Sequence, residues 1–143
     1  GADVIAGFPG ETADDFDETI RLIRESGLGY LHAFPYSARG GTESAGWPDD
    51  VPPAEKKRRV ARLLDIDAAM RERGLVEQVG KILTMIAESR DPATGAYRGT
   101  SENYFEVTFR SVGEILGELH PVRILSVHGN LLRGWAANAA AAG

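Results

Sequence analysis

The sequence has no cysteine among its 143 residues. The lack of thiols excludes disulfides, cysteine-based nucleophilic catalysis and cysteine-ligated zinc or iron–sulfur clusters within the chain. Histidine is almost as scarce, because the 3 histidines, His32, His120 and His128, are scattered and show no metal-ligand spacing. We therefore expect no metal site in this chain.

Long apolar runs and an excess of positive charge are also missing. No apolar run approaches the ~18–20 residues of a membrane span, and no signal peptide is visible, so a soluble, cytoplasmic protein with no membrane partner is expected. The net charge of −5 argues against broad electrostatic capture of nucleic acid. From residue 79 onward acidic and basic residues balance, so RNA binding there would need shape and specific contacts.

The chain opens with the pattern of a strand, a tight turn and a helix. The apolar run Val4–Ala6 leads into Gly7–Gly10, and Thr12–Asp15 has the pattern of a capping box at a helix start. Apolar residues at helical spacing follow, and Gly27 is a typical left-handed stop. Residues 30–36 predict a second strand. Together these segments predict one βαβ unit with a parallel sheet.

A linker and a long helix are expected next. Residues 37–53 are rich in glycine and proline, and Pro53 suits the first turn of a helix that runs to about Gly74 or slightly beyond. Its expected apolar stripe is Val60, Leu63, Leu64 and Met70. A basic cluster near its start predicts a solvated face, with contact to RNA phosphates as the alternative; its members are Lys56, Lys57, Arg58, Arg59 and Arg62.

Beyond Gly80 the apolar residues alternate with period two, which predicts a small OB-type β-barrel. Gly129-Asn130 is the expected turn between the last two strands. The fold class is therefore α/β plus β: a βαβ unit and long helix over 1–78, an OB-like antiparallel barrel over 79–137, and a tail over 138–143. The five expected strands cover residues 81–87, 96–99, 104–109, 122–127 and 131–135.

Three segments, in order, carry a resemblance to a known family. Residues 3–12, with Asp15-Phe16, resemble the "DVIVGFPGETEEDF" segment of radical-SAM methylthiotransferases. Residues 31–39, with Gly41-Thr42, resemble their "LHVFPYSPRPGT" strand and loop, and residues 100–104 resemble the "TENY" signature of their C-terminal TRAM domain with one residue inserted. The forms of the last two segments are most similar to the branch that modifies N6-threonylcarbamoyladenosine in tRNA.

The resemblance implies a reaction and its cofactors. In this family a 4Fe–4S cluster cleaves S-adenosylmethionine, the resulting radical abstracts hydrogen from C2 of a modified adenosine in the tRNA anticodon stem-loop, and a second 4Fe–4S cluster takes part in methylthio transfer. The cluster cysteines would lie upstream of Gly1, in missing N-terminal domains. The chain would then be the end of the TIM-like radical-SAM barrel plus the TRAM domain, with no catalytic residue of its own and no activity alone.

The resemblance also suggests site residues. It places the turn after the first strand beside the S-adenosylmethionine pocket, with exposed N–H groups able to meet an anionic group; the cofactor-side residues are Gly7, Phe8, Pro9, Gly10 and Glu11, joined by Tyr36, Ser37 and Arg39 after the second strand. Arg39 could bind a carboxylate or phosphate. The RNA-binding residues suggested by the TRAM signature are Thr100, Glu102, Asn103 and Tyr104.

Each assignment has a structural alternative: a plain strand-to-helix turn, a surface arginine that bridges loops, or a tyrosine that starts a buried strand. Trp47 and Trp135 are expected to pack rather than stack on bases. Two other functions stay open. One is a free-standing TRAM-type RNA-binding module. The other is a non-functional gene remnant whose open sheet edges favour aggregation.

Overall fold

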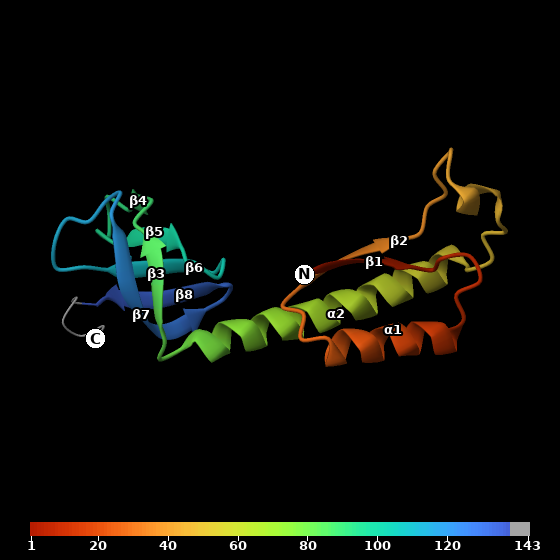
Figure 1. The fold of residues 1–143 in the computed structure, drawn as a ribbon, viewed down its shortest axis with the longest axis horizontal. Helices are drawn as coiled ribbons and strands as arrows, with labels where there is room; N and C mark the ends of the chain where they lie inside the picture. Colours follow the sequence, from red (N-terminus) through yellow and green to blue (C-terminus); the bar gives the residue numbers. More distant parts are fainter. Residues whose placement is uncertain (138–143) are drawn as a thin grey trace. The chain divides into compact units, whose positions relative to one another are not determined.

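In the computed structural model, which describes residues 1–137, two units with separate hydrophobic cores follow each other along the chain (Figure 1). The first unit comprises Gly1–Arg71, and the second begins at Glu72. The fold is mixed α/β, with two helices, a two-stranded sheet and a curled six-stranded sheet. The expected tail, residues 138–143, lies outside the described residues.

The first unit begins with the expected βαβ arrangement. Strands β1 (Ala2–Ala6) and β2 (Leu31–Pro35) are parallel, with Ala2 opposite Leu31 and Ala6 opposite Pro35. Helix α1 (Ala13–Glu25) connects them. A short 3-10 helix η1 (Glu43–Gly46) lies in the predicted linker, and the long helix α2 (Pro53–Gln78) follows.

The start of α1 is fixed by the predicted capping box. The Asp15 backbone N–H donates to Thr12 Oγ1 at 3.1 Å, and the Thr12 N–H donates to Asp15 Oδ2 at 2.9 Å. The Thr12 backbone N–H, with help from its hydroxyl, lowers the pKa of the Asp15 carboxyl. After the helix, Gly27 has φ +70°, a left-handed conformation that favours glycine. Both helix boundaries predicted by these two motifs are confirmed.

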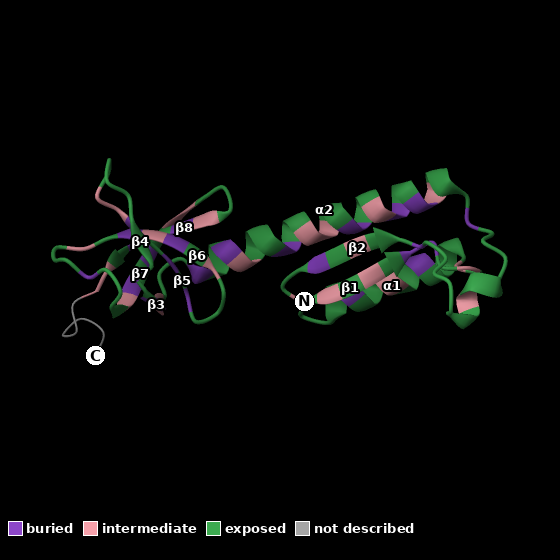
Figure 2. Ribbon diagram, turned by 90° about the horizontal axis from the view of Figure 1, so that it is seen from above, coloured by how far each residue is buried: buried purple, intermediate pink, exposed green. Residues whose placement is uncertain are grey.

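Helices α1 and α2 cover one face of the two-stranded sheet (Figure 2). The other face carries Ile5 and Phe34, which are 53% and 51% exposed. Parallel sheets are normally covered on both faces, so in the described residues this sheet lacks a second covering layer. The buried residues of this first core are Ala6, Phe16, Ile20, Ile23, Leu31, Leu63 and Met70.

One prediction about α2 needs correction. Leu64 does not belong to the buried stripe, because it is 50% exposed, and Ile66 packs against the first core instead. The helix also continues through Gly74 to Gln78. Glycine inside a helix costs about 1 kcal/mol relative to alanine, and burial of Leu75 in the second core offsets that cost.

The second unit is a sheet of six strands in the order β3-β7-β8-β6-β5-β4. All five predicted strands are present, and a short additional strand, β4, precedes the turn at residues 91–95. The strands are β3 (Ile82–Ile86), β4 (Ser89–Arg90), β5 (Tyr97–Thr100), β6 (Glu106–Arg110), β7 (Leu119–His128) and β8 (Leu131–Ala136). Because β8 lies between β7 and β6, it pairs antiparallel with β7 but parallel with β6, so the expectation of a purely antiparallel sheet is wrong.

The sheet curls until its two ends meet. Met85 in β3 forms an isolated bridge with Ser101, and the Glu102 N–H donates to the Thr84 carbonyl at 3.0 Å. Gly99 lies so close to β3 that a Cβ there would meet the Ile86 carbonyl. The curled sheet encloses the second core, whose largest fully buried side chains include Tyr97, Phe109, Met85, Ile124 and Leu132.

Adjacent leucines of α2 provide a test of the first core. Leu63→Ala should lower the free energy of unfolding by about 2–5 kcal/mol, because Leu63 is fully buried and truncation leaves a cavity. Leu64→Ala, at a half-exposed position, should cost less than about 1 kcal/mol. Urea unfolding measures both values. Equal effects at the two positions would contradict the packing described here.

Candidate functional site

The turn Gly7–Glu11 follows the carboxyl end of β1, where the sequence places the cofactor-side residues. Gly7 and Gly10 have φ +75° and +83°, so both lie in the left-handed region that other residues enter at a cost. The Glu11 N–H donates to the Phe8 carbonyl at 2.9 Å and closes the turn around Pro9. The backbone of this segment is therefore held in one tight conformation.

Carboxylates of the protein itself bind two N–H donors of this turn. The Gly7 N–H donates to Glu11 Oε1 at 2.9 Å, and the Gly10 N–H donates to Asp50 Oδ1 at 2.8 Å. The Thr12 and Asp15 N–H groups are bound within the capping box. These four N–H groups are therefore bound to acceptors of the chain itself.

A buried ion pair anchors the turn to α2. Arg59 is 5% exposed, and its Nη1 donates to Glu11 Oε1 at 2.6 Å and to the Glu11 carbonyl at 3.0 Å. Its Nε donates to Glu55 Oε1 at 2.8 Å. Burial of the guanidinium lowers the pKa of Arg59, but the hydrogen bonds to Glu11 and Glu55 outweigh this effect and raise it.

A second buried cation lies one helical turn away. Lys56 is 7% exposed, and its Nζ lies 2.6 and 2.7 Å from the two carboxylate oxygens of Asp49. The same Nζ lies 5.2 Å from the centroid of the Tyr36 ring. A Cβ at Gly7 would collide with the Lys56 side chain, so the glycine permits this close approach.

The basic cluster is thus divided between two environments. Lys57 and Arg58 are exposed, as a solvated face predicts, but for Lys56 and Arg59 that prediction is wrong. Their spacing of three places both on the side of α2 that meets Glu11 and Asp49. The acidic residue Glu11 after the Gly-Phe-Pro-Gly turn and two cations at helical spacing were the available signal for this pairing.

Three aromatic rings from different segments meet beside the turn. Phe8 contacts Tyr36 and Trp47 edge-on, with centroid distances of 5.2 and 5.8 Å. Tyr36 is buried and donates its hydroxyl to the Ser44 carbonyl at 3.0 Å, whereas Phe8 and Trp47 are 36% and 46% exposed. Next to Tyr36 lies an open hollow of ≈ 450 Å³, lined by Pro35, Tyr36, Pro53, Lys56, Lys57 and Val60.

Ser37 and Arg39 are exposed in the loop after β2. The Arg39 carbonyl accepts from the Thr42 N–H and hydroxyl at 3.2 and 2.7 Å, which shapes the loop. Arg59 and Lys56 form ion pairs with carboxylates. Within residues 1–137, by contrast, the Arg39 guanidinium has no carboxylate oxygen within 4.0 Å. Of the predicted cofactor-side residues, the structure brings together Gly7, Phe8, Glu11 and Tyr36.

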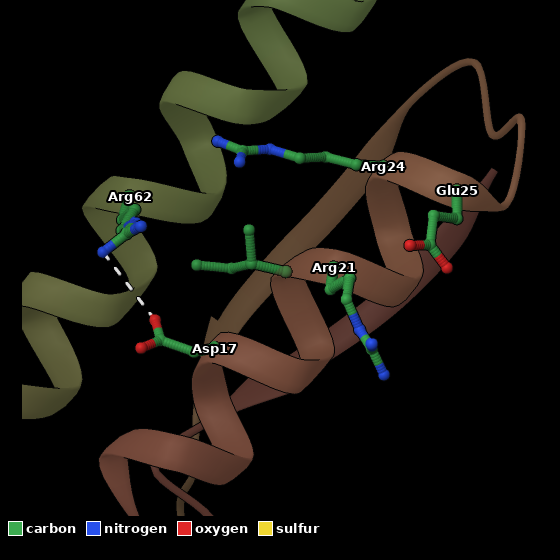
Figure 3. A pocket seen from close by; sticks show the side chains of 6 residues that line it. Asp17, Arg21, Arg24, Glu25 and Arg62 are labelled. Carbon is green, nitrogen blue, oxygen red and sulfur yellow. Dashed lines mark ion pairs between the residues drawn. The ribbon is translucent and has the colours of Figure 1, made fainter.

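Another hollow, of ≈ 350 Å³, lies between α1 and the first part of α2 (Figure 3). Arg62 and Asp17 form a long ion pair across it at 3.9 Å. Arg24 and Arg21 point in different directions (Figure 3). Because these cations do not converge on one point, the hollow has no arrangement for binding an anion.

The predicted RNA-facing turn, residues 100–104, is shaped by internal hydrogen bonds. The Ser101 hydroxyl donates to Asn103 Oδ1 at 2.7 Å, and Asn103 Nδ2 donates to Gln78 Oε1 at 3.1 Å. The Glu102 backbone pairs with β3, and Thr100 ends β5. Asn103 therefore stabilises the turn, and its amide is already bound to the protein.

Tyr104 is the exposed residue of this turn. Its side chain is 90% exposed, and its backbone has φ +68°, a strained conformation for a residue with a large side chain. The alternative that it starts a buried strand is wrong, because β6 begins only at Glu106. The strain is held in place by the bond from the Tyr104 N–H to the Ser101 carbonyl at 2.9 Å.

The described part of the chain contains no cluster of three or more His, Cys, Asp or Glu that could hold a metal ion. The sequence has no cysteine either, so this chain does not supply the thiolate ligands of an iron–sulfur cluster. None of the helices of residues 1–137 combines the length and apolar character needed to cross a membrane.

The two adjacent arginines of α2 allow a matched test of the anchor. Arg59→Met should lower the free energy of unfolding by about 3–5 kcal/mol, because it leaves the largely buried Glu11 carboxylate without its cation. Arg58→Met removes an exposed partner of the same Glu55 and should cost much less, because solvent screens an exposed ion pair. Urea unfolding of both variants decides, and a small effect at Arg59 would contradict the anchoring role.

Glu55 provides a test by pH. Hydrogen bonds from Arg58 and then Arg59 lower the pKa of Glu55 from 4.5 to about 2 in the folded chain. Its contribution to stability is therefore complete above about pH 5 and is lost as the pH falls toward 2. Urea unfolding from pH 6 to pH 2.5 should show the difference between the wild type and Glu55→Gln shrinking with acidification. A difference that stays constant would contradict this shift.

Comparison with known proteins gives relatives over almost the whole chain. A protein of Shewanella sp. (strain W3-18-1) is 40% identical over 136 residues, which is 93% of this chain, and is named tRNA-2-methylthio-N(6)-dimethylallyladenosine synthase. Proteins of the same name from Shewanella putrefaciens and Shewanella oneidensis match at the same identity and length. No family model matches the chain.

The chain spans only 28% of the length of these relatives. Their name agrees with the resemblance to tRNA methylthiotransferases, but it specifies the dimethylallyl-bearing nucleoside rather than the threonylcarbamoyl-bearing one. The chain is therefore homologous, over nearly all its residues, to about a quarter of synthases that form a 2-methylthio-adenosine derivative in tRNA.

Proposed function

We propose that this chain is the C-terminal part of a radical-SAM tRNA methylthiotransferase, which adds a methylthio group at C2 of an N6-modified adenosine next to the anticodon. The observation that carries the proposal is the 40% identity over 93% of the chain to synthases of that class. The order of the three motif segments along the chain agrees with it.

The open sheet of the first unit supports a place inside a larger parallel barrel. Two parallel strands with helices on one face leave Ile5 and Phe34 exposed on the other. In a larger barrel, β1 and β2 would have further strands beside them. The face that carries Ile5 and Phe34 would then line the barrel interior, where other side chains would cover it. The chain would then contribute the last βαβ unit of that barrel.

The strand order of the second unit supports a TRAM domain. If β3 and β4 are counted as one bent strand, the curled sheet has five strands, and the third and fifth of these are parallel neighbours. This Greek-key arrangement is typical of OB-type barrels, which often bind oligonucleotides. We propose that the exposed Tyr104 contacts RNA, with Thr100, Glu102 and Asn103 holding its turn in shape.

We propose the turn after β1 as one wall of the S-adenosylmethionine pocket. The exposed rings of Phe8 and Trp47 can contact a purine or thioether group, whereas the Gly7 and Gly10 N–H donors are bound to Glu11 and Asp50. Arg39, with its unpaired guanidinium among the described residues, is the candidate for a carboxylate. The cofactor supplies the radical chemistry, and the cluster ligands would come from domains outside this chain.

Two substrates fit this reaction class. The names of the relatives support N6-dimethylallyladenosine, whose apolar substituent needs no cation. The "FPYS" and "TENY" forms of the motifs support N6-threonylcarbamoyladenosine, whose carboxylate would pair with a cation such as Arg39. A single nucleoside analysis separates these possibilities.

The whole reading frame that contains this chain should restore 2-methylthio-adenosines in the tRNA of a host that lacks both methylthiotransferases. Mass spectrometry of digested tRNA then identifies the N6 substituent of the modified nucleoside. The 143-residue chain expressed alone should leave the tRNA unmodified, because it lacks cluster ligands. The proposed function would be contradicted if the whole reading frame restored neither of the two 2-methylthio nucleosides.

A further inference from the structure

The outer face of the curled sheet carries an aromatic ring between two arginines. Strand register places Trp135 of β8 directly opposite Arg123 of β7 on one side and opposite Arg110 of β6 on the other. Neighbouring strands are about 4.8 Å apart, so the three side chains form one row across three strands. Their inward-facing neighbours Phe109, Ile124 and Gly134 are buried, so the row points outward.

The charges of this face differ from those of the rest of the unit. Arg90 and Arg98 form ion pairs with Glu114 and Glu106. Arg110, Arg123 and Arg133 have no carboxylate partner in residues 1–137 within the ion-pair distance. Residues 79–137, whose charges balance, therefore carry their arginines without a carboxylate partner on three adjacent strands.

Arg110 and Trp135 of the row line a hollow of ≈ 520 Å³ on the sheet surface, together with Leu125, Arg133 and Gly134. Trp135 is 44% exposed, so part of its ring is accessible. Asp91 lies at the rim of this hollow, and its carboxylate accepts from the Ala93 N–H and the Thr94 hydroxyl, which lower its pKa and keep it charged. The negative charge of Asp91 repels phosphate groups. A phosphate would therefore bind on the side of the hollow where the arginines lie.

We propose that this face binds a single-stranded segment of RNA, with an unpaired base stacked on Trp135 and the flanking phosphates held by Arg110 and Arg123. An exposed aromatic ring offers the flat surface that a base needs, and arginine binds phosphate through paired N–H groups. The proposal rests on the proposed function in taking RNA as the partner. It moves the main contact from the turn at Tyr104 to Trp135, which the sequence suggested as a packing residue.

The test uses the full 143-residue chain with Trp47→Phe, so that Trp135 is the only tryptophan. The probe is a fluorescein-labelled 17-nucleotide RNA hairpin with an unpaired adenine-containing loop. Its binding to the chain is measured by fluorescence anisotropy at several salt concentrations. Base stacking should quench Trp135 fluorescence on binding. Trp135→Leu should weaken binding about 5- to 100-fold, whereas Trp135→Phe, which keeps an aromatic face, should retain most of it.

The arginine variants test the phosphate contacts. Arg110→Gln with Arg123→Gln should weaken binding and reduce the salt slope by about 1.4, because each single-strand phosphate contact contributes about 0.7. The matched control is Arg21→Gln with Arg24→Gln on α1, which changes the net charge equally and should leave affinity within about twofold. A circular-dichroism spectrum and urea midpoint verify that each variant is folded.

Several results would overturn the inference. These are no binding of the hairpin in 50 mM salt, equal binding of a fully paired RNA duplex, displacement of the hairpin by a polyglutamate peptide, or loss of binding on Tyr104→Ala but not on changing the row. Failure of the proposed function is a separate outcome, since it would show as unmodified tRNA while the chain still bound the hairpin through Trp135.

Discussion

The buried contact between Arg59 and Glu11 is the constraint on which the first unit depends. Removing a guanidinium and a carboxylate from water is costly, and only mutual pairing with further hydrogen bonds makes it tolerable. Here the Glu11 carboxylate also accepts from the Gly7 N–H, and Arg59 also binds the Glu11 carbonyl and Glu55. One ion pair thus connects the end of β1, the turn, the start of α1 and the first part of α2.

The same contact explains the arrangement of the candidate cofactor side. The Gly7 and Gly10 N–H donors are bound by Glu11 and Asp50, and the partly exposed Phe8 ring lies beside them against Tyr36. Lys56 is likewise a buried cation that pairs with a carboxylate of the chain, because its Nζ binds Asp49 next to the Tyr36 ring. The described residues contain no buried side-chain polar atom without a hydrogen-bond partner. The buried charged groups beside the turn are therefore bound to other groups of the chain and stabilise its fold.

The two units reach stability in different ways. The second unit encloses its own core, since its sheet curls until β3 meets the end of β5. The first unit packs two helices on a single face of two parallel strands and leaves the other face uncovered. The uncovered face of the first unit is consistent with the end of a barrel that needs neighbouring strands. The second unit, in contrast, is a β-module with a core of its own.

The sequence by itself determined both helices and the five main strands of the second unit, but not the short strand β4. The capping box at Thr12, the left-handed stop at Gly27 and the alternation beyond Gly80 act through neighbouring residues, so local chemistry sufficed to predict them. The tertiary structure alone decided which charges are buried and which side chains share a face. Arg59 and Glu11 are 48 residues apart, and Arg110 and Trp135 meet only because β8 inserts beside β6. Pairings of this kind depend on strand order and helix packing, which no local pattern encodes.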